Sequence, residues 1–196
     1  MSKQLTIEQI QQQAEELGIA PATLQAIHEV ECRGSGFNPD NTPVILFERH
    51  VMRERLIANK FFSVAEKMEI KRPDLCNKSS GAYGLYSAQH GRLAVAAEYH
   101  REIALESCSW GIGQVMGYHW KSLNYPSLQA FINEMYKNEA SQLEAMCRYI
   151  KVNNLVNALK NNDWKAFALG YNGKAYAKNK YDIKLANAYK KFVEGS

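Results

Sequence analysis

Most of the chain places its apolar residues three and four positions apart, which is the spacing of a helix with one buried face. The first such segment starts after Thr6, which forms a capping-box pattern with Gln9, and it stops at Gly18. A second segment begins with Pro21 at a first helical position and continues to the glycine-rich break at residues 34–36. The pattern therefore predicts two short helices at the start of the chain.

One apolar run does not follow the helical period. Residues 43–47 (Pro-Val-Ile-Leu-Phe) are short and partly β-branched, so they predict a strand or an extended segment. Residues 61–85 have no clear pattern, and Pro73 and the Ser-Ser-Gly cluster at 79–81 indicate loops. Helices are expected at 49–59, 87–105, 128–135, 143–150, 156–159, 164–168 and 180–193, with a glycine-punctuated turn and a short helix at 109–117.

The predicted elements amount to about eight helices and at most a small β-element, so the expected class is mainly α, of the α+β kind. The chain has 196 residues, with 46% apolar and 22% charged residues, which is typical of a soluble globular protein. It shows no internal repeat and no low-complexity linker. We therefore expect a single domain over residues 1–196.

Charge and targeting signals narrow the possible partners. The formal net charge of +4 favours approach to an anionic polymer or surface without identifying one. No zinc-finger spacing, RNP-like motif or long Arg-rich run is present, so nucleic acid is not an expected partner. The N-terminus has no apolar signal region and no stretch approaches 18 apolar residues, which predicts synthesis in the cytoplasm without a membrane span.

The four cysteines and five histidines do not predict a metal site. Cys32, Cys76, Cys108 and Cys147 form no CxxC pair, and the histidines lack HExxH spacing. We expect reduced cysteines, no metal and no cofactor.

Glu31 is the first candidate for acid chemistry. It ends an apolar helix, and the partial negative charge of a helix C-terminus, together with burial, would raise the pKa of a carboxyl group there. A raised pKa is what a general acid needs at neutral pH. The alternative is a solvated Glu paired with Arg33, and that Arg would lower the pKa instead.

Two further carboxylates could assist. Glu48 follows the apolar run at 43–47 and could be a second carboxylate at a cleft, or an ion-pair partner that orients the end of the strand. Glu106 precedes the glycine-rich turn and could position water, or could form a salt link at a helix end. Glycoside hydrolysis usually uses two carboxyl groups.

Two motifs later in the chain could bind a ligand. Gly111 and Gly113 precede Gln114 and would allow a close backbone approach, either to another helix or to a bound sugar. Tyr171 and Asn172, before Gly173, could stack on and hydrogen-bond a sugar, or simply form an Asn-Gly turn.

The order of these motifs is more specific than any one of them. A Glu at a helix end, then a Gly-x-x-Gln motif, then a Tyr-Asn-Gly motif resembles the signature of the lysozyme-like superfamily, which includes goose-type lysozymes and soluble lytic transglycosylases. The fuller strings at 30–37, 43–50 and 107–117 resemble the N-acetylmuramidase domain of phage endolysins, over about residues 20–190. The chain departs from the usual pattern of these proteins at two places. Cys32-Arg33 follows the Glu, where Ser-Gly is more usual, and Gly173 stands where Ala-Gly is common.

The resemblance implies a lysozyme-like fold whose small β-element lies beside an active-site groove, with no separate wall-binding module. It implies a peptidoglycan hydrolase that cleaves the β-1,4 bond between N-acetylmuramic acid and N-acetylglucosamine. Glu31 would be the catalytic acid and Glu48 a second catalytic carboxylate. The residues expected to contact the glycan are Gln114, Tyr171, Asn172, Gly111, Gly113, Trp110 and Tyr118.

Several alternatives remain open at this stage. The same scaffold serves lytic transglycosylases, which give anhydromuramic products, and a non-catalytic wall-binding phage protein could retain the fold. The Lys-rich C-terminal segment could contact anionic wall or outer-membrane lipid, or be a solvated helix face with its Tyr residues inward. We expect a monomer, and the resemblance implies release to the wall with the help of a holin.

Overall fold

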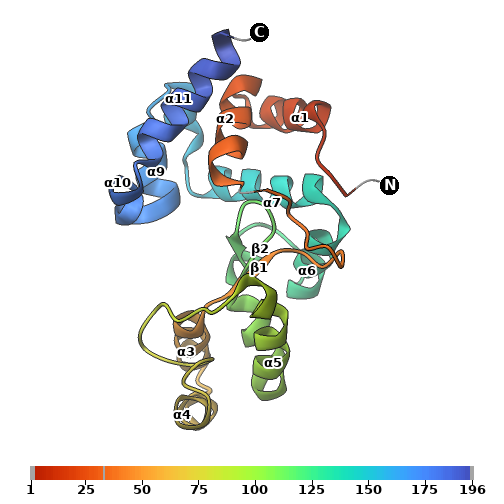
Figure 1. Cartoon of the computed structure of the whole chain (residues 1–196), viewed down its shortest axis with the longest axis vertical. Helices are drawn as coiled ribbons and strands as arrows, with labels where there is room; N and C mark the ends of the chain where they lie inside the picture. Colours follow the sequence, from red (N-terminus) through yellow and green to blue (C-terminus); the bar gives the residue numbers. More distant parts are fainter. Residues whose placement is uncertain (1–2, 33, 195–196) are drawn as a thin grey trace.

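The computed structural model describes residues 3–32 and 34–194. Helices from both ends of the chain gather at one end of the molecule, and those from residues 49–106 form the other (Figure 1). The first group is α1 (Ile7–Leu17), α2 (Pro21–Glu31), α9 (Trp164–Asn172), α10 (Tyr176–Asn179) and α11 (Tyr181–Glu194). The second group is α3 (Arg49–Ala58), α4 (Phe62–Lys71) and α5 (Gln89–Glu106).

Between these two groups lie a long helix and a small sheet (Figure 1). Three more helices continue the chain after the sheet: α6 (Leu128–Lys137), α7 (Glu139–Val152) and α8 (Val156–Lys160). Short 3₁₀ turns lie at η1 (Tyr86–Ala88), η2 (Gly117–His119) and η3 (Gly173–Ala175). The mainly helical α+β class is confirmed, with eleven α-helices in the described residues rather than about eight.

The predicted helix ends are confirmed at the N-terminus. The Gln9 amide donates to Thr6 Oγ1 at 3.3 Å, and the Thr6 amide donates to Gln9 Oε1 at 3.0 Å, which completes the capping box. Gly18 ends α1 in the left-handed conformation with φ +68°, and Pro21 opens α2. Helix α2 ends at Glu31, just before the glycine-rich break at residues 34–36.

The short helix predicted at 109–117 is wrong. This segment forms a β-hairpin of β2 (Cys108–Trp110) and β3 (Val115–Met116). Gly111 and Gln114 have left-handed backbones, with φ +66° and φ +46°, and two such residues inside a short segment cannot belong to a right-handed helix.

Helix α4 lies in the segment that showed no clear pattern. Its inner face is small, with only Ala65 and Met68 buried. Phe62 and Ile70 are exposed at 60% and 75%, so apolar residues on the outer face obscure the helical period.

The sheet sorts its side chains into a core face and an open face. Strand β1 (Ile45–Phe47) pairs antiparallel with β2, with Leu46 opposite Ser109, and β2 pairs with β3, with Ser109 opposite Met116. The core face of the sheet carries side chains that are almost fully buried, those of Ile45, Phe47 and Trp110. Because side chains alternate along a strand, residues 44, 46 and 48 lie on the open face.

All four cysteines lie in the hydrophobic core. Burial raises the pKa of the Cys76 thiol to about 11 and that of the Cys147 thiol to about 12. These groups are therefore neutral thiols at physiological pH. In the ranges 3–32 and 34–194, no helix has the length and apolar character needed to cross a membrane.

The packing beside the sheet gives a test of the fold. A Cβ at Gly117 would lie 2.3 Å from the Leu105 carbonyl oxygen, whereas one at Gly91 would meet no atom of the described residues within 4 Å. We predict that Gly117→Ala lowers the free energy of unfolding by about 1–3 kcal/mol, because the α5 backbone must move. Gly91→Ala is the control and should be neutral or stabilising by up to about 1 kcal/mol, since Ala favours helix. Urea unfolding of both variants measures this, and equal stabilities would contradict the packing described here.

Candidate active site

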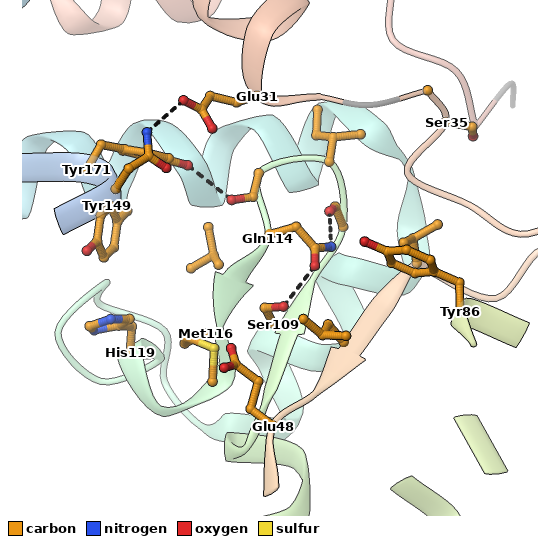
Figure 2. Close-up of a pocket in the computed structure, with 18 of the residues that line it drawn as sticks. Glu31, Ser35, Glu48, Tyr86, Ser109, Gln114, Met116, His119, Tyr149 and Tyr171 are labelled. Carbon is orange, nitrogen blue, oxygen red and sulfur yellow. Dashed lines mark hydrogen bonds between the residues drawn. The ribbon is translucent and has the colours of Figure 1, made fainter. Parts of the chain in front are cut away.

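A pocket of about 710 Å³ lies between the end of α2, the open face of the sheet and the helices α7 and α9. Figure 2 shows Glu31 on one side of this pocket and Glu48 on the opposite side, with Gln114 and Ser109 between them. The pocket thus brings together residues that lie far apart along the chain.

Glu31 is the last residue of α2 and is half-buried at the pocket wall. Asn172, at the end of α9, donates from Nδ2 to Glu31 Oε1 at 2.9 Å, across 141 positions of sequence (Figure 2). This bond fixes the orientation of the carboxyl group. Arg33, proposed above as a modulator of Glu31, lies outside the described residues.

Tyr171 connects α9 to the hairpin. Its hydroxyl donates to the Gly113 carbonyl oxygen at 3.0 Å, and its ring stacks on Phe167 and meets Tyr149 edge-on. Burial raises the pKa of Tyr171 well above its ordinary value, and the neighbouring Glu31 adds to this effect. Tyr171 is therefore a neutral phenol that holds the Gly113 loop beside Glu31.

The Gly-x-Gly-Gln motif forms the turn of the hairpin. The Ser109 hydroxyl donates to Gln114 Oε1 at 2.8 Å, and Gln114 Nε2 donates to the Gly111 carbonyl oxygen at 2.8 Å. Gln114 therefore closes its own turn while lining the pocket. Gly111 and Gly113 also line the pocket.

Buried polar side chains of α7 hold two loops near Glu31, namely the loop that follows α2 and the turn of the hairpin. The sequence analysis missed these side chains. Gln142 accepts from the Ile112 amide at 3.0 Å and donates to the Gly36 carbonyl oxygen at 3.3 Å. Glu139 accepts from the Gly36 amide at 2.7 Å. The available signal was two polar residues at helical spacing on the buried face of α7.

The glycines at these loops are needed because of Gln142. A Cβ at Gly36 would lie 2.0 Å from Gln142 Oε1, and one at Gly111 would lie 2.5 Å from Gln142 Cδ. Gly111 also has a left-handed φ of +66°, which disfavours a side chain whatever the space. The close approach that Gly111 allows is therefore to a side chain of another helix, α7.

Glu48 lies on the opposite wall because strand alternation directs it there, after Val44 and Leu46, which also line the pocket. The Tyr83 hydroxyl donates to Glu48 Oε2 at 3.2 Å, and His50 Nε2 lies 3.7 Å from the same oxygen. The Glu48 side chain remains 20% exposed. A second carboxylate thus reaches the pocket with one oxygen held by a phenol.

Two sequence candidates are not in the pocket. Trp110 is 1% exposed and donates its indole N–H to the Leu105 carbonyl oxygen at 3.2 Å, so the expected contact of Trp110 with the glycan is wrong. Glu106 is buried. It accepts two hydrogen bonds from Arg55, at 2.7 and 2.9 Å, and one from Trp120 at 3.1 Å. Glu106 is therefore the salt link at a helix end and is not a water-positioning base.

Several aromatic residues complete the pocket wall. Tyr118 lines it, and so do His119, Tyr149 and Tyr86, which the sequence analysis missed. Burial and the nearby Arg55 lower the pKa of His119, which keeps its imidazole neutral at physiological pH. Isolated aromatics carry no motif, so only their placement in the fold identifies them.

The described residues contain no group of three or more His, Cys, Asp or Glu side chains that could hold a metal ion. The pocket itself is lined by carboxyl, amide and phenol groups.

Comparison with known proteins agrees with this geometry. The crystal structure of the Burkholderia AP3 phage endolysin superposes on this chain with a TM-score of 0.93 and 40% sequence identity, covering 99% of this chain and 73% of that one. No curated protein sequence matches the chain. Residues 20–193 match the sequence profile of the N-acetylmuramidases. The chain therefore belongs to the N-acetylmuramidase family of peptidoglycan-degrading enzymes.

Proposed function

We propose that this chain is an endolysin that hydrolyses the β-1,4 bond between N-acetylmuramic acid and N-acetylglucosamine in peptidoglycan. The observation that carries the proposal is a pair of carboxyl groups, Glu31 and Glu48, on opposite sides of one pocket. Glycosidases usually need one carboxyl group as acid and another as base or nucleophile. A glycan strand that lies along the pocket would pass between the two.

Glu31 acts as the general acid in this proposal. Asn172 donates to Oε1, which orients the carboxyl group toward the pocket. Protonated Glu31 donates this proton to the glycosidic oxygen as the bond to the sugar C1 breaks and positive charge develops on the ring. General acid catalysis of this kind contributes about 10²- to 10⁴-fold to the rate.

Glu48 assists on the opposite side. As a carboxylate it can either deprotonate the attacking water or stabilise the positive charge on the ring. The presence of this second carboxylate favours hydrolysis over the transglycosylase reaction, in which the muramic 6-hydroxyl attacks in place of water. Because Glu106 is held by Arg55 and Trp120, Glu48 is the better candidate of the two for this task.

The wider surface fits an anionic polymer as substrate. The net charge is +4, and the lysines of the C-terminal region are exposed, although Lys191 pairs with Glu29 at 2.9 Å. We include in the proposal a transient contact of helix α11 with anionic wall or outer-membrane lipid. The proposed enzyme acts as a monomer and reaches the wall with the help of a holin.

Substitution of Glu31 tests its role as the acid. Glu31→Gln keeps the shape of the side chain and its bond from Asn172 but removes the exchangeable carboxyl proton, so we expect a loss of at least about 100-fold in the clearing of purified peptidoglycan. Glu29→Gln is the matched control, because Glu29 lies on the same helix, is exposed and pairs with Lys191 outside the pocket. It should clear peptidoglycan at the parent rate. A turbidity assay measures all three proteins, and circular dichroism checks that each is folded.

Equal clearing rates for the parent and for folded Glu31→Gln would overturn the assignment of the acid. Inactivity of the parent on purified peptidoglycan would favour a non-catalytic wall-binding role.

Substitution of Asn172 tests the hydrogen bond between Asn172 and Glu31. Asn172→Ala leaves the carboxyl group without its positioning donor, so we expect kcat to fall about tenfold while the stability changes little. In the Glu31→Gln background the same substitution should have almost no further effect, because both residues act through one proton transfer. A double-mutant cycle of kcat values tests this. Additive effects would contradict the proposed coupling.

A further inference from the structure

An exposed aromatic residue stands at one end of the pocket and has no part in the proposed chemistry. Tyr86 is 67% exposed and lines the pocket. In the part of the chain that the structure describes, no hydrogen bond or ring contact to its side chain is found. A single exposed aromatic is ordinary on a protein surface, but its place at a pocket edge makes it available to a ligand.

The backbone that carries Tyr86 is firmly anchored. Gln89 is 1% exposed, and its Nε2 donates to the carbonyl oxygens of Tyr83 and Leu85 at 2.7 and 2.9 Å. The Phe47 amide of strand β1 donates to Gln89 Oε1 at 3.0 Å. One buried amide thus fixes the segment before Tyr86 to the sheet that carries Glu48.

The position of Tyr86 relative to the carboxyl groups is informative. Figure 2 shows Tyr86 at one end of the pocket and Tyr149 with His119 at the other, with Glu31 and Glu48 between the two ends. If a linear polymer passes between the carboxyl groups, Tyr86 would therefore meet a sugar unit that lies away from the bond that is cut.

We propose that Tyr86 is a stacking platform for an N-acetylhexosamine ring of the glycan, at a subsite remote from the scissile bond. This rests on the proposed function, since it requires that the pocket hold a glycan strand. The C–H face of a pyranose ring is apolar and flat enough to pack on a phenol ring, whose hydroxyl can bond the sugar's polar edge. An anchored Tyr offers this surface at a small cost in conformational entropy.

A platform of this kind has a distinct kinetic signature. It contacts the substrate equally in the ground state and in the transition state, because its sugar does not react. Loss of the ring should therefore raise KM and leave kcat unchanged.

The experiment compares Tyr86→Ala, Tyr86→Trp and Leu85→Ala. Leu85 is the matched control: it is the adjacent residue, is 75% exposed and does not line the pocket. The probes are peptide-free glycan strands of peptidoglycan for kinetics and a β-1,4-linked N-acetylglucosamine hexamer for calorimetric titration. The titrations use the Glu31→Gln background, so that affinity is measured without cleavage.

We expect Tyr86→Ala to raise KM and Kd about 3- to 10-fold with kcat unchanged, and Tyr86→Trp to keep parent values. Leu85→Ala should also keep parent values. Parent-like affinity of Tyr86→Ala, or a fall in kcat at constant KM, would overturn the platform. Glycan binding that depends on Tyr86 without any cleavage by the parent would leave the platform standing and overturn the proposed function. Absence of glycan binding by the parent would overturn both.

Discussion

The active-site geometry depends on buried hydrogen bonds from one helix, α7. Gln142 joins the loop after Glu31 to the turn of the hairpin, through the Gly36 carbonyl oxygen and the Ile112 amide. Glu139 adds a bond to the Gly36 amide. Because a buried polar group left without its partner costs about 1–3 kcal/mol, these bonds oppose any separation of the two loops. The loop after Glu31 and the Gly-x-Gly-Gln turn are therefore held on one support.

Much of the site could be predicted because its residues lie at the ends of regular elements. The helical period and the glycine break located Glu31 at the end of a helix, and the turn motifs located Gln114 and Asn172. Their meeting in one pocket could be expected only from the order of the motifs. The structure adds the contacts themselves, such as the bond from Asn172 to Glu31.

The parts that could not be predicted have physical causes. Trp110 has the residue type of a sugar-binding side chain, but strand alternation turns it into the core. Glu106 lies near the turn in sequence, yet Arg55, from another helix, binds it. Gln142 and Glu139 carry no motif, and their role depends on backbone groups brought to them by folding. Long-range pairing of this kind leaves little trace in one sequence.

The proposed reaction unites these features, since the α7 bonds hold the acid opposite Glu48 with room for a glycan between them. The most direct test digests purified peptidoglycan with the parent protein in water enriched in ¹⁸O and analyses the fragments by mass spectrometry. Hydrolysis between N-acetylmuramic acid and N-acetylglucosamine predicts reducing muramic ends that carry one ¹⁸O atom. Anhydromuramic ends without label, or reducing ends on N-acetylglucosamine, would contradict it.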